Sequence, residues 1–267
     1  MRVLGSLENA VAHSTLRAAL LACALVAGPA LAAPGVDAEA DRILKSMSTY
    51  LAGAKSLSVT AEIDLEIITK EAQKLQFSSY ANVVVQRPAG LSVKRKGMLA
   101  ETEAFYDGKT LTLYGAGRNA YGQKALVGTN DTAILAFESE TGIPAPAADL
   151  LLTDPYKILI SGANNGSYIG NTYVDGIECQ HLAFRKDDVD WQIWIQAGDK
   201  PLPMKYVITS KWQTGAPQFE VRFRGWNTNP TIDSKQFTFT PPAGATKQEN
   251  LAVDEMAELT DAKGTGK

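Results

Sequence analysis

The sequence predicts a mainly β protein of the α+β class, in which one large curved antiparallel sheet forms an incomplete barrel and helices plug its concave face. About eleven segments carry a strand pattern, and hairpin-length loops join nearly all of them. A sheet of this size must curl or split to bury its apolar face. One long helix and a few short ones are available to cover the concave side, and an incomplete barrel follows from this.

The composition is typical of a globular protein with an apolar core. The chain has 267 residues, of which 45% are hydrophobic and 21% are charged. The formal net charge is −3 and the isoelectric point is about 5.5. This balance provides no electrostatic footprint for nucleic acid or for an anionic membrane surface.

Residues 1–33 are predicted to be a cleaved signal peptide. Arg2 and Arg17 precede an apolar run over residues 18–27, and a small-x-small pattern ends at Ala32. The apolar run is too short to span a bilayer. We therefore expect export to the periplasm, with cleavage after Ala32 or the alanine that follows it.

Cys23 leaves one alternative open, because residues 20–23 loosely fit a lipobox and would anchor the protein through a lipid. Only a few apolar residues separate this cysteine from Arg17, which favours the cleaved signal. Cleavage leaves Cys179 as the one cysteine, so no internal disulfide is expected. The mature chain is predicted to be a monomer with a single domain over residues 34–247 and a flexible tail over residues 248–267.

The first folded element is predicted to be a helix over residues 37–52, because its apolar residues recur at helical spacing. Strict alternation over residues 57–67, and again over residues 75–85, predicts two long strands that each bury one face. Pro88 ends the second strand, since proline cannot donate to a ladder. Shorter strands are expected over residues 91–98, 102–106, 110–114 and 121–127. Asp107-Gly108 indicates a two-residue hairpin turn in which both residues adopt positive φ.

The alternation stops at Thr129, and residues 129–161 are the one place where helical patterns interrupt the strands. A short helix is predicted around Ala133, and further helical turns over residues 147–152 and 154–160. We call residues 129–161 the lid segment, because this Leu- and Ile-rich stretch is available to cover the sheet. Strand patterns return from Gly166, with the Asp175-Gly176 hairpin turn, and continue over residues 177–185, 191–196, 203–212 and 218–226.

No catalytic residues, metal ligands or cofactor are predicted. Cys179 and His181 lie on one face of a strand, but side chains two apart usually stand too far from each other for a thiol–imidazole pair. Asp187, Asp188 and Asp190 lie at a hairpin tip, where solvated charge is the simpler interpretation than a metal site. An enzymatic function nevertheless remains a third hypothesis, after the carrier and the interaction functions that are described below.

The tryptophans leave another alternative open. Trp191, Trp194, Trp212 and Trp226 could form a platform that stacks sugars, although such residues on alternating strands more often belong to the core or the barrel rim. The apolar face of the predicted sheet is also larger than the area that the few predicted helices could cover. A hydrophobic-ligand cavity and an ordinary filled core are both compatible with this pattern.

Three phrases resemble the periplasmic lipoprotein-carrier (LolA-like) superfamily. They lie at residues 85–88 (Val-Gln-Arg-Pro), at residues 106–111 with Tyr114 after them, and at residues 237–244 (Phe-Thr-Phe-Thr-Pro-Pro-Ala-Gly). The predicted periplasmic branch known as DUF2092 is the most similar group. The resemblance implies an unclosed barrel that binds acyl chains without catalysis. It also implies that Arg87 hydrogen-bonds the helical lid, as the arginine of this phrase does in the carrier.

The leading hypothesis is therefore a periplasmic binding or carrier protein for a lipid or the acyl chain of a lipoprotein, with a partner protein in the inner or outer membrane. The alternative is an envelope-sensing or protein-interaction module on the same fold. The predicted ligand-binding residues combine the apolar faces of the early and late strands with the lid-facing arginine: Val59, Ile63, Phe77, Val83, Arg87, Trp191, Phe219 and Phe223.

Overall fold

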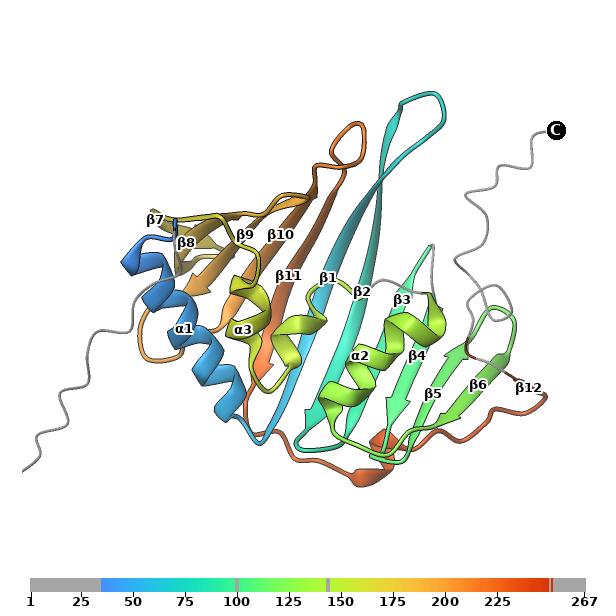
Figure 1. Cartoon of the computed structure of the whole chain (residues 1–267). Coiled ribbons are helices and arrows are strands. Elements are labelled where there is room, and N and C mark those ends of the chain that lie inside the picture. Colours follow the sequence, from blue (N-terminus) through green and yellow to red (C-terminus); the bar gives the residue numbers. More distant parts are fainter. Residues whose placement is uncertain (1–34, 99–100, 143–144, 250, 252–267) are drawn as a thin grey trace, which may run out of the picture. The chain divides into compact units, whose positions relative to one another are not determined.

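A computed structural model describes residues 35–98, 101–142, 145–249 and 251, and within them the predicted fold class is confirmed (Figure 1). Twelve strands form one sheet in the order β12-β6-β5-β4-β3-β2-β1-β11-β10-β9-β8-β7. All neighbours are antiparallel except β12 and β6, which are parallel. The two edge strands, β12 and β7, do not pair with each other, so the sheet is an incomplete barrel.

The strand bounds follow the alternating patterns closely. In the first half they are β1 (Ser56–Ile68), β2 (Lys74–Gln86), β3 (Leu91–Gly97), β4 (Glu101–Tyr106), β5 (Thr110–Gly115) and β6 (Ala120–Ala125). In the second half they are β7 (Asn165–Val174), β8 (Ile177–Arg185), β9 (Val189–Gln196), β10 (Pro203–Ser210), β11 (Gln218–Asn227) and β12 (Thr246–Gln248).

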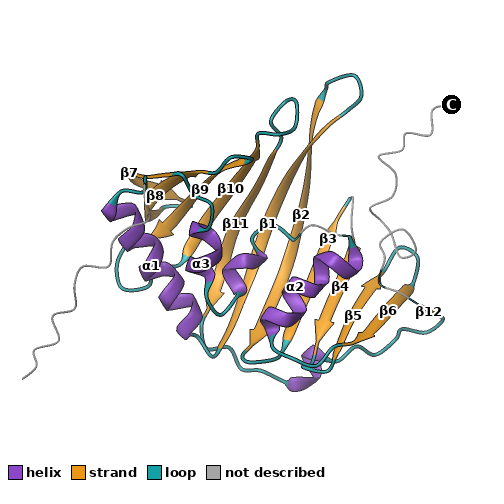
Figure 2. Cartoon of the chain, viewed as in Figure 1, coloured by secondary structure: helices purple, strands orange, loops and turns teal. Residues whose placement is uncertain are grey.

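Strand β1 joins the two halves of the sheet, because it pairs with β2 on one side and with β11 on the other. Val59 lies opposite Val83 of β2, and Ala61 lies between Ala81 of β2 and Phe223 of β11. Residues two apart share a face of a strand, so these side chains point to the same side of the sheet. Figure 2 shows that α1, α2 and α3 all lie on one side of the sheet.

Two hairpin turns were predicted, and one prediction was wrong. Asp175 and Gly176 have φ values of 51° and 79° and join β7 to β8 as a two-residue turn, as expected. Asp107 does not adopt positive φ among the described residues, and three residues separate β4 from β5. The Asp107 carboxylate instead accepts hydrogen bonds from the backbone N–H groups of Lys109 and Thr110. A side chain that bonds the following backbone stabilises the longer loop.

The helices are α1 (Ala38–Gly53), α2 (Asn130–Thr141) and α3 (Pro155–Ile160), with the short 3₁₀ turns η1 (Ala148–Leu151) and η2 (Ser234–Phe237). Asp37 caps α1 by accepting a hydrogen bond from the backbone N–H of Ala40 at 2.6 Å. The apolar face of α1 is buried over β7 and its neighbouring strands, while the lid segment lies over the middle and the other half of the sheet (Figure 1).

The predicted domain limits remain predictions. The signal peptide over residues 1–33 and most of the proposed tail lie outside the described residues. Strand β12 was not predicted, because three residues are too few for an alternating pattern. It ends at Gln248, and Leu251 beyond it is buried in the core, so the described part of the chain packs slightly past residue 247.

Candidate ligand-binding cavity

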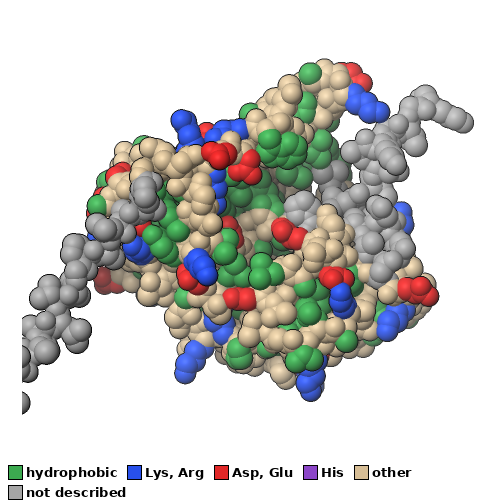
Figure 3. Space-filling model, viewed as in Figure 1, with side chains coloured by type: hydrophobic (Ala, Val, Ile, Leu, Met, Phe, Trp, Pro, Cys, Tyr) green, Lys and Arg blue, Asp and Glu red, His purple; other side chains and the backbone are tan. Residues whose placement is uncertain are grey.

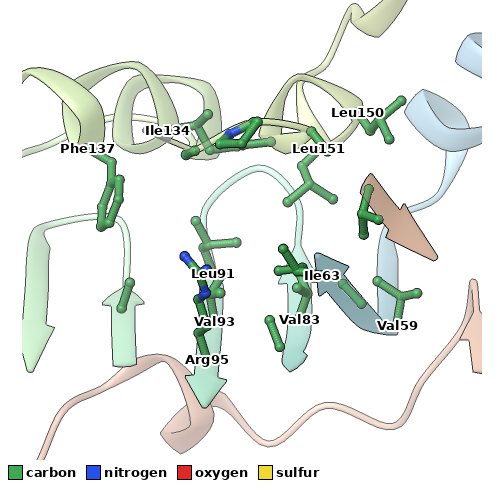
Figure 4. Close-up of a pocket in the computed structure, with 18 of the residues that line it drawn as sticks. Val59, Ile63, Val83, Leu91, Val93, Arg95, Ile134, Phe137, Leu150 and Leu151 are labelled. Atoms are coloured by element: carbon green, nitrogen blue, oxygen red, sulfur yellow. The ribbon is translucent and has the colours of Figure 1, made fainter. Parts of the chain in front are cut away.

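An apolar cavity of about 180 Å³ lies between the lid segment and the central strands (Figure 4). The view in Figure 3 shows a hollow in this face of the molecule with hydrophobic side chains around it. Its floor comes from β1–β5 and β11, and its roof comes from α2, η1 and the residues between them. The lining residues are almost all aliphatic or aromatic: Val59, Ala61, Ile63, Ala81, Val83, Leu91, Val93, Ala104, Phe105, Leu111, Leu113, Ala133, Ile134, Phe137, Ala145, Pro146, Ala147, Ala148, Leu150, Leu151, Phe219, Val221, Phe223 and Trp226, with Arg95 and Thr102 as the polar members.

Small side chains explain why the space is not filled. Ala61 and Ala81 lie opposite each other on β1 and β2, and Ala104 continues the floor on β4. The roof above them contributes Ala133 from α2 and further alanines from the connection to η1. Alanine contributes only a methyl group to either surface, so sheet and lid segment meet without closing the gap.

The lid segment is attached to the sheet through the start of α2. The buried Asn130 amide donates to the carbonyl of Gln86 at 2.9 Å and accepts from the N–H of Gly90 at 2.8 Å. The Asn130 backbone N–H also donates to the carbonyl of Pro88 at 2.8 Å. The turn between β2 and β3 is thereby fixed to the first residue of α2. Next to it, the Asp131 carboxylate accepts hydrogen bonds from Thr153 and links the start of α2 to the residues between η1 and α3.

Arg87 lies in the same turn and contacts the lid segment as the resemblance implies. Its Nη2 donates to the backbone carbonyl of Leu152, just after η1, at 3.2 Å. Its Nε and Nη1 are buried and have no hydrogen-bond partner among the described residues. Burial lowers the pKa of the Arg87 guanidinium, and the nearby Asp131 carboxylate partly offsets this by favouring the charged form.

Asp149 places a second ionisable group on the lid segment. Its Oδ1 is buried without a hydrogen-bond partner among the described residues. Burial raises the pKa of Asp149 to about 6, while backbone donors and the charge of Lys186 act in the opposite direction. Tyr206 of β10 lies beside this carboxyl group, and burial raises the pKa of its phenol well above the usual value.

The structure brings together five of the eight predicted ligand-binding residues. Val59, Ile63, Val83, Phe219 and Phe223 line the cavity, and Arg87 bonds the lid segment without lining the space. Phe77 and Trp191 lie outside this lining, and the assignment of all eight residues to ligand binding stays a prediction.

Phe77 lies outside the cavity because of strand length. Pairing of β2 with β3 begins at Ser79, so Phe77, two residues earlier, lies on the part of the β1–β2 hairpin that projects beyond the neighbouring strand (Figure 1). Trp191 lies on β9, in the half of the sheet that α1 covers. There it is 2% exposed, with its ring stacked on Phe184 at 4.1 Å, and belongs to filled core.

The other tryptophans do not form a shared platform. Trp226 lines the cavity and donates from Nε1 to the Pro203 carbonyl at 2.8 Å. Trp194 stacks on His181 at 4.1 Å, and Trp212 is 72% exposed on the loop after β10.

Cys179 and His181 each have a separate partner. The buried Cys179 thiol donates to the Ile177 carbonyl at 3.4 Å, and burial raises its pKa to about 11. The His181 Nε2 bonds the Gln192 side chain at 3.0 Å, and burial lowers the pKa of the imidazole. Within the described ranges no three His, Cys, Asp or Glu side chains are grouped as metal ligands would be.

Helices thus cover an open antiparallel sheet, and an apolar cavity lies between the helices and the sheet. The chain belongs to the DUF2092 family, described as predicted periplasmic protein, whose model matches residues 40–249. The periplasmic localisation predicted from the signal pattern agrees with this family. None of the helices in the described ranges combines the length and apolarity that crossing a bilayer requires.

Several solved structures are similar in fold. An uncharacterized conserved protein from Thermus thermophilus is 12% identical, with a TM-score of 0.48 over 79% of this chain and 99% of its own. The lipoprotein LppX from Mycobacterium tuberculosis is 14% identical, with a TM-score of 0.45 over 74% of this chain and 100% of its own. The LolA superfamily protein NE2245 from Nitrosomonas europaea is 9% identical, with a TM-score of 0.37 over 75% and 97%. No curated protein matches the chain.

Proposed function

We propose that this protein binds lipids, or the acyl chains of lipidated proteins, in the periplasm and carries them without chemical change. The observation that carries the proposal is the cavity lining, in which only Arg95 and Thr102 are polar. Burying one methylene of an acyl chain in such a space contributes about 0.8 kcal/mol. Apolar binding needs no more than the cavity itself.

The size of the cavity indicates how a ligand would enter. A dry apolar cavity of about 150 Å³ holds a molecule the size of benzene. The 180 Å³ under the lid segment therefore accommodates only a short piece of an acyl chain. The cavity is partly open to solvent (Figure 3), so a longer chain can extend out of it, and movement of the lid segment away from the sheet would widen this opening.

The contacts at the start of α2 favour a hinge at that end of the lid segment. Asn130 fixes α2 to the turn between β2 and β3 with three hydrogen bonds, while single bonds hold the η1–α3 end, from Arg87 to the Leu152 carbonyl and from the Tyr156 hydroxyl to Asp41 of α1 at 2.5 Å. Single bonds are easier to break than the set of three at Asn130. A partner protein in either membrane, and the alternative role in envelope sensing, stay predictions from the resemblance.

The experiment is native mass spectrometry of the protein purified from the periplasm without detergent, together with titration of the neutral apolar dye N-phenyl-1-naphthylamine. We expect bound lipid masses that are lost in organic solvent, and an increase in dye fluorescence that added fatty acid reverses. A protein that carries no lipid and binds neither dye nor fatty acid would contradict the proposal.

A further inference from the structure

Arg95 is the one charged side chain in the lining of the cavity. It lies on β3 two residues after Val93 and four after Leu91, so it shares their inward face (Figure 4). Its register partners are Ala81 on β2 and Thr102 on β4, and both line the cavity. Arg95 is near the end of β3, at Gly97, while Leu91 begins the strand, so along β3 the floor of the cavity is charged near one end and apolar at the other.

The Arg95 guanidinium keeps N–H donors that are available for a ligand. Its Nε donates to the Ser79 hydroxyl at 3.1 Å, which uses one of the five N–H groups of the side chain. Burial lowers the pKa of Arg95, and no carboxylate among the described residues contributes to that shift. A half-buried cation that has no anionic partner within this part of the chain is costly unless something else neutralises it.

The other cations of β3 show the contrast. Lys94 and Lys96 flank Arg95 in the sequence and point to the opposite face of the sheet. Lys94 forms an ion pair with Glu103 at 2.9 Å, and Lys96 forms one with Glu101 at 3.3 Å, both across the β3–β4 pair. The two lysines on the outer face of β3 thus form ion pairs with glutamates of β4. Arg95, on the inner face, hydrogen-bonds a serine hydroxyl instead.

We propose that Arg95 binds the anionic head group, a carboxylate or a phosphate, of an amphiphile whose hydrocarbon chain lies in the cavity. This inference rests on the proposed function and specifies the ligand class. A planar guanidinium can donate two parallel hydrogen bonds to either head group. The chain would then run along the inward face of β3 from Arg95 past Val93 towards Leu91.

The test is displacement of N-phenyl-1-naphthylamine by three competitors with the same tail: dodecanoate, dodecyl phosphate and dodecan-1-ol. We expect the two anions to displace the dye at least about tenfold better than the alcohol, because hydrogen bonds to charged groups are the strong ones. Inorganic phosphate and acetate should leave the dye bound, which separates an amphiphile site from a site for free anions. Displacement of the dye by inorganic phosphate at the same concentration as dodecyl phosphate would overturn the proposal.

The matched variants are Arg95→Gln and Lys94→Gln, which remove one positive charge from the inward and the outward face of the same strand. Arg95→Gln should lose the preference for anions over the alcohol, whereas Lys94→Gln, on the opposite face of the strand, should keep both the dye binding and the anion preference of the wild type. If the wild type binds dodecan-1-ol as tightly as dodecanoate, or if Arg95→Gln keeps the preference, this inference is wrong and the proposed function stands. If the dye does not bind and the protein also carries no lipid and binds no fatty acid, the proposed function itself fails.

Discussion

Asp149 is a residue whose ionisation state matters to the lid segment that carries it. Its pKa is about 6 in the folded protein, against a usual value of 3.8. The folded state therefore binds a proton more tightly than the unfolded chain does. Between these two values the folded state holds more protons, so stability falls as the pH rises through this range. Above about pH 6 the folded protein carries the full cost of a buried charge on η1.

Replacing Asp149 with Asn removes that cost and keeps an oxygen that can accept from Tyr206. We expect Asp149→Asn to raise the free energy of unfolding by about 1–3 kcal/mol at pH 8 and to have little effect at pH 3.5. Urea denaturation at the two pH values measures this. Asp199→Asn, on the exposed loop between β9 and β10, removes the same charge as a control. Equal effects of Asp149→Asn at both pH values would show that the carboxyl group titrates normally.

Arg87 combines a favourable contact with an unfavourable environment. It donates one hydrogen bond to Leu152, while two of its nitrogen atoms are buried without partners in the described ranges. The bond and the cost of burying the guanidinium oppose each other, so the net contribution to global stability is small. The contact matters chiefly for how often the lid segment separates from the sheet.

We therefore expect Arg87→Met to change the unfolding free energy by less than about 1 kcal/mol but to open the lid segment more often. Backbone hydrogen exchange in residues 148–160 should accelerate by about three- to tenfold, with α1 unchanged. Arg42→Met, which breaks an exposed pair with Glu39 on α1, is the control for loss of an arginine. Unchanged exchange in residues 148–160 would mean that Arg87 does not hold the lid segment.

At the scale of elements, the position of α2 on the sheet is fixed by the Asn130 side chain, which bonds the turn between β2 and β3 and not the helix itself. Asn130 is 1% exposed, and its amide bonds the backbone of the turn between β2 and β3 at both Gln86 and Gly90. Gly90 has a φ of 159°, and a Cβ there would come within 2.9 Å of the Phe237 ring, so the turn packs too closely for a larger residue. The orientation of α2 is thus set by this turn.

Asn130→Ala should destabilise the protein by about 2–4 kcal/mol, because a buried donor and a buried acceptor of the turn lose their partners at once. Thr129→Ala, one residue earlier, is the matched control. Thr129 is exposed and is the N-cap of α2, where it forms a capping box with Thr132, so this change should cost about 1 kcal/mol and less than Asn130→Ala. Equal losses in the two variants, measured by chemical denaturation, would contradict a special role for Asn130.

The elements could be predicted from the sequence because one face of each strand is buried and the alternation shows it. Strands β1 to β11 and the lid segment follow from such patterns, whereas β12 is too short to have one. Arg95 was missed although a signal existed, since it continues the inward series of Leu91 and Val93 as a charged residue. Trp191 was assigned to the cavity because the alternating pattern shows only that its side chain points to the inner face of the sheet. The pattern does not show which helix packs on that part of the face.

At the scale of the whole described fold, one sheet is divided into a filled part and a hollow part by what covers it. Helix α1 fills its side with residues such as Ile43 and Leu44, which are almost fully buried. The lid segment presents alanines to the other side and leaves 180 Å³ open. Core packing normally eliminates a void of this size, because the surrounding atoms lose their contacts. The presence of this cavity therefore favours a ligand-binding role for it.

That argument predicts that filling the cavity separates stability from binding. Ala81→Leu combined with Ala104→Leu adds apolar volume to the floor of the cavity, where both alanines are buried and face the space. The unfolding temperature should stay the same or rise, since the new side chains occupy a void, while binding of N-phenyl-1-naphthylamine should weaken by at least about tenfold. Ala125→Leu, at the exposed end of β6, should change neither property. A double variant that is as stable as the wild type and still binds the dye fully would show that ligands bind elsewhere, because the filled floor leaves too little room beneath the lid segment.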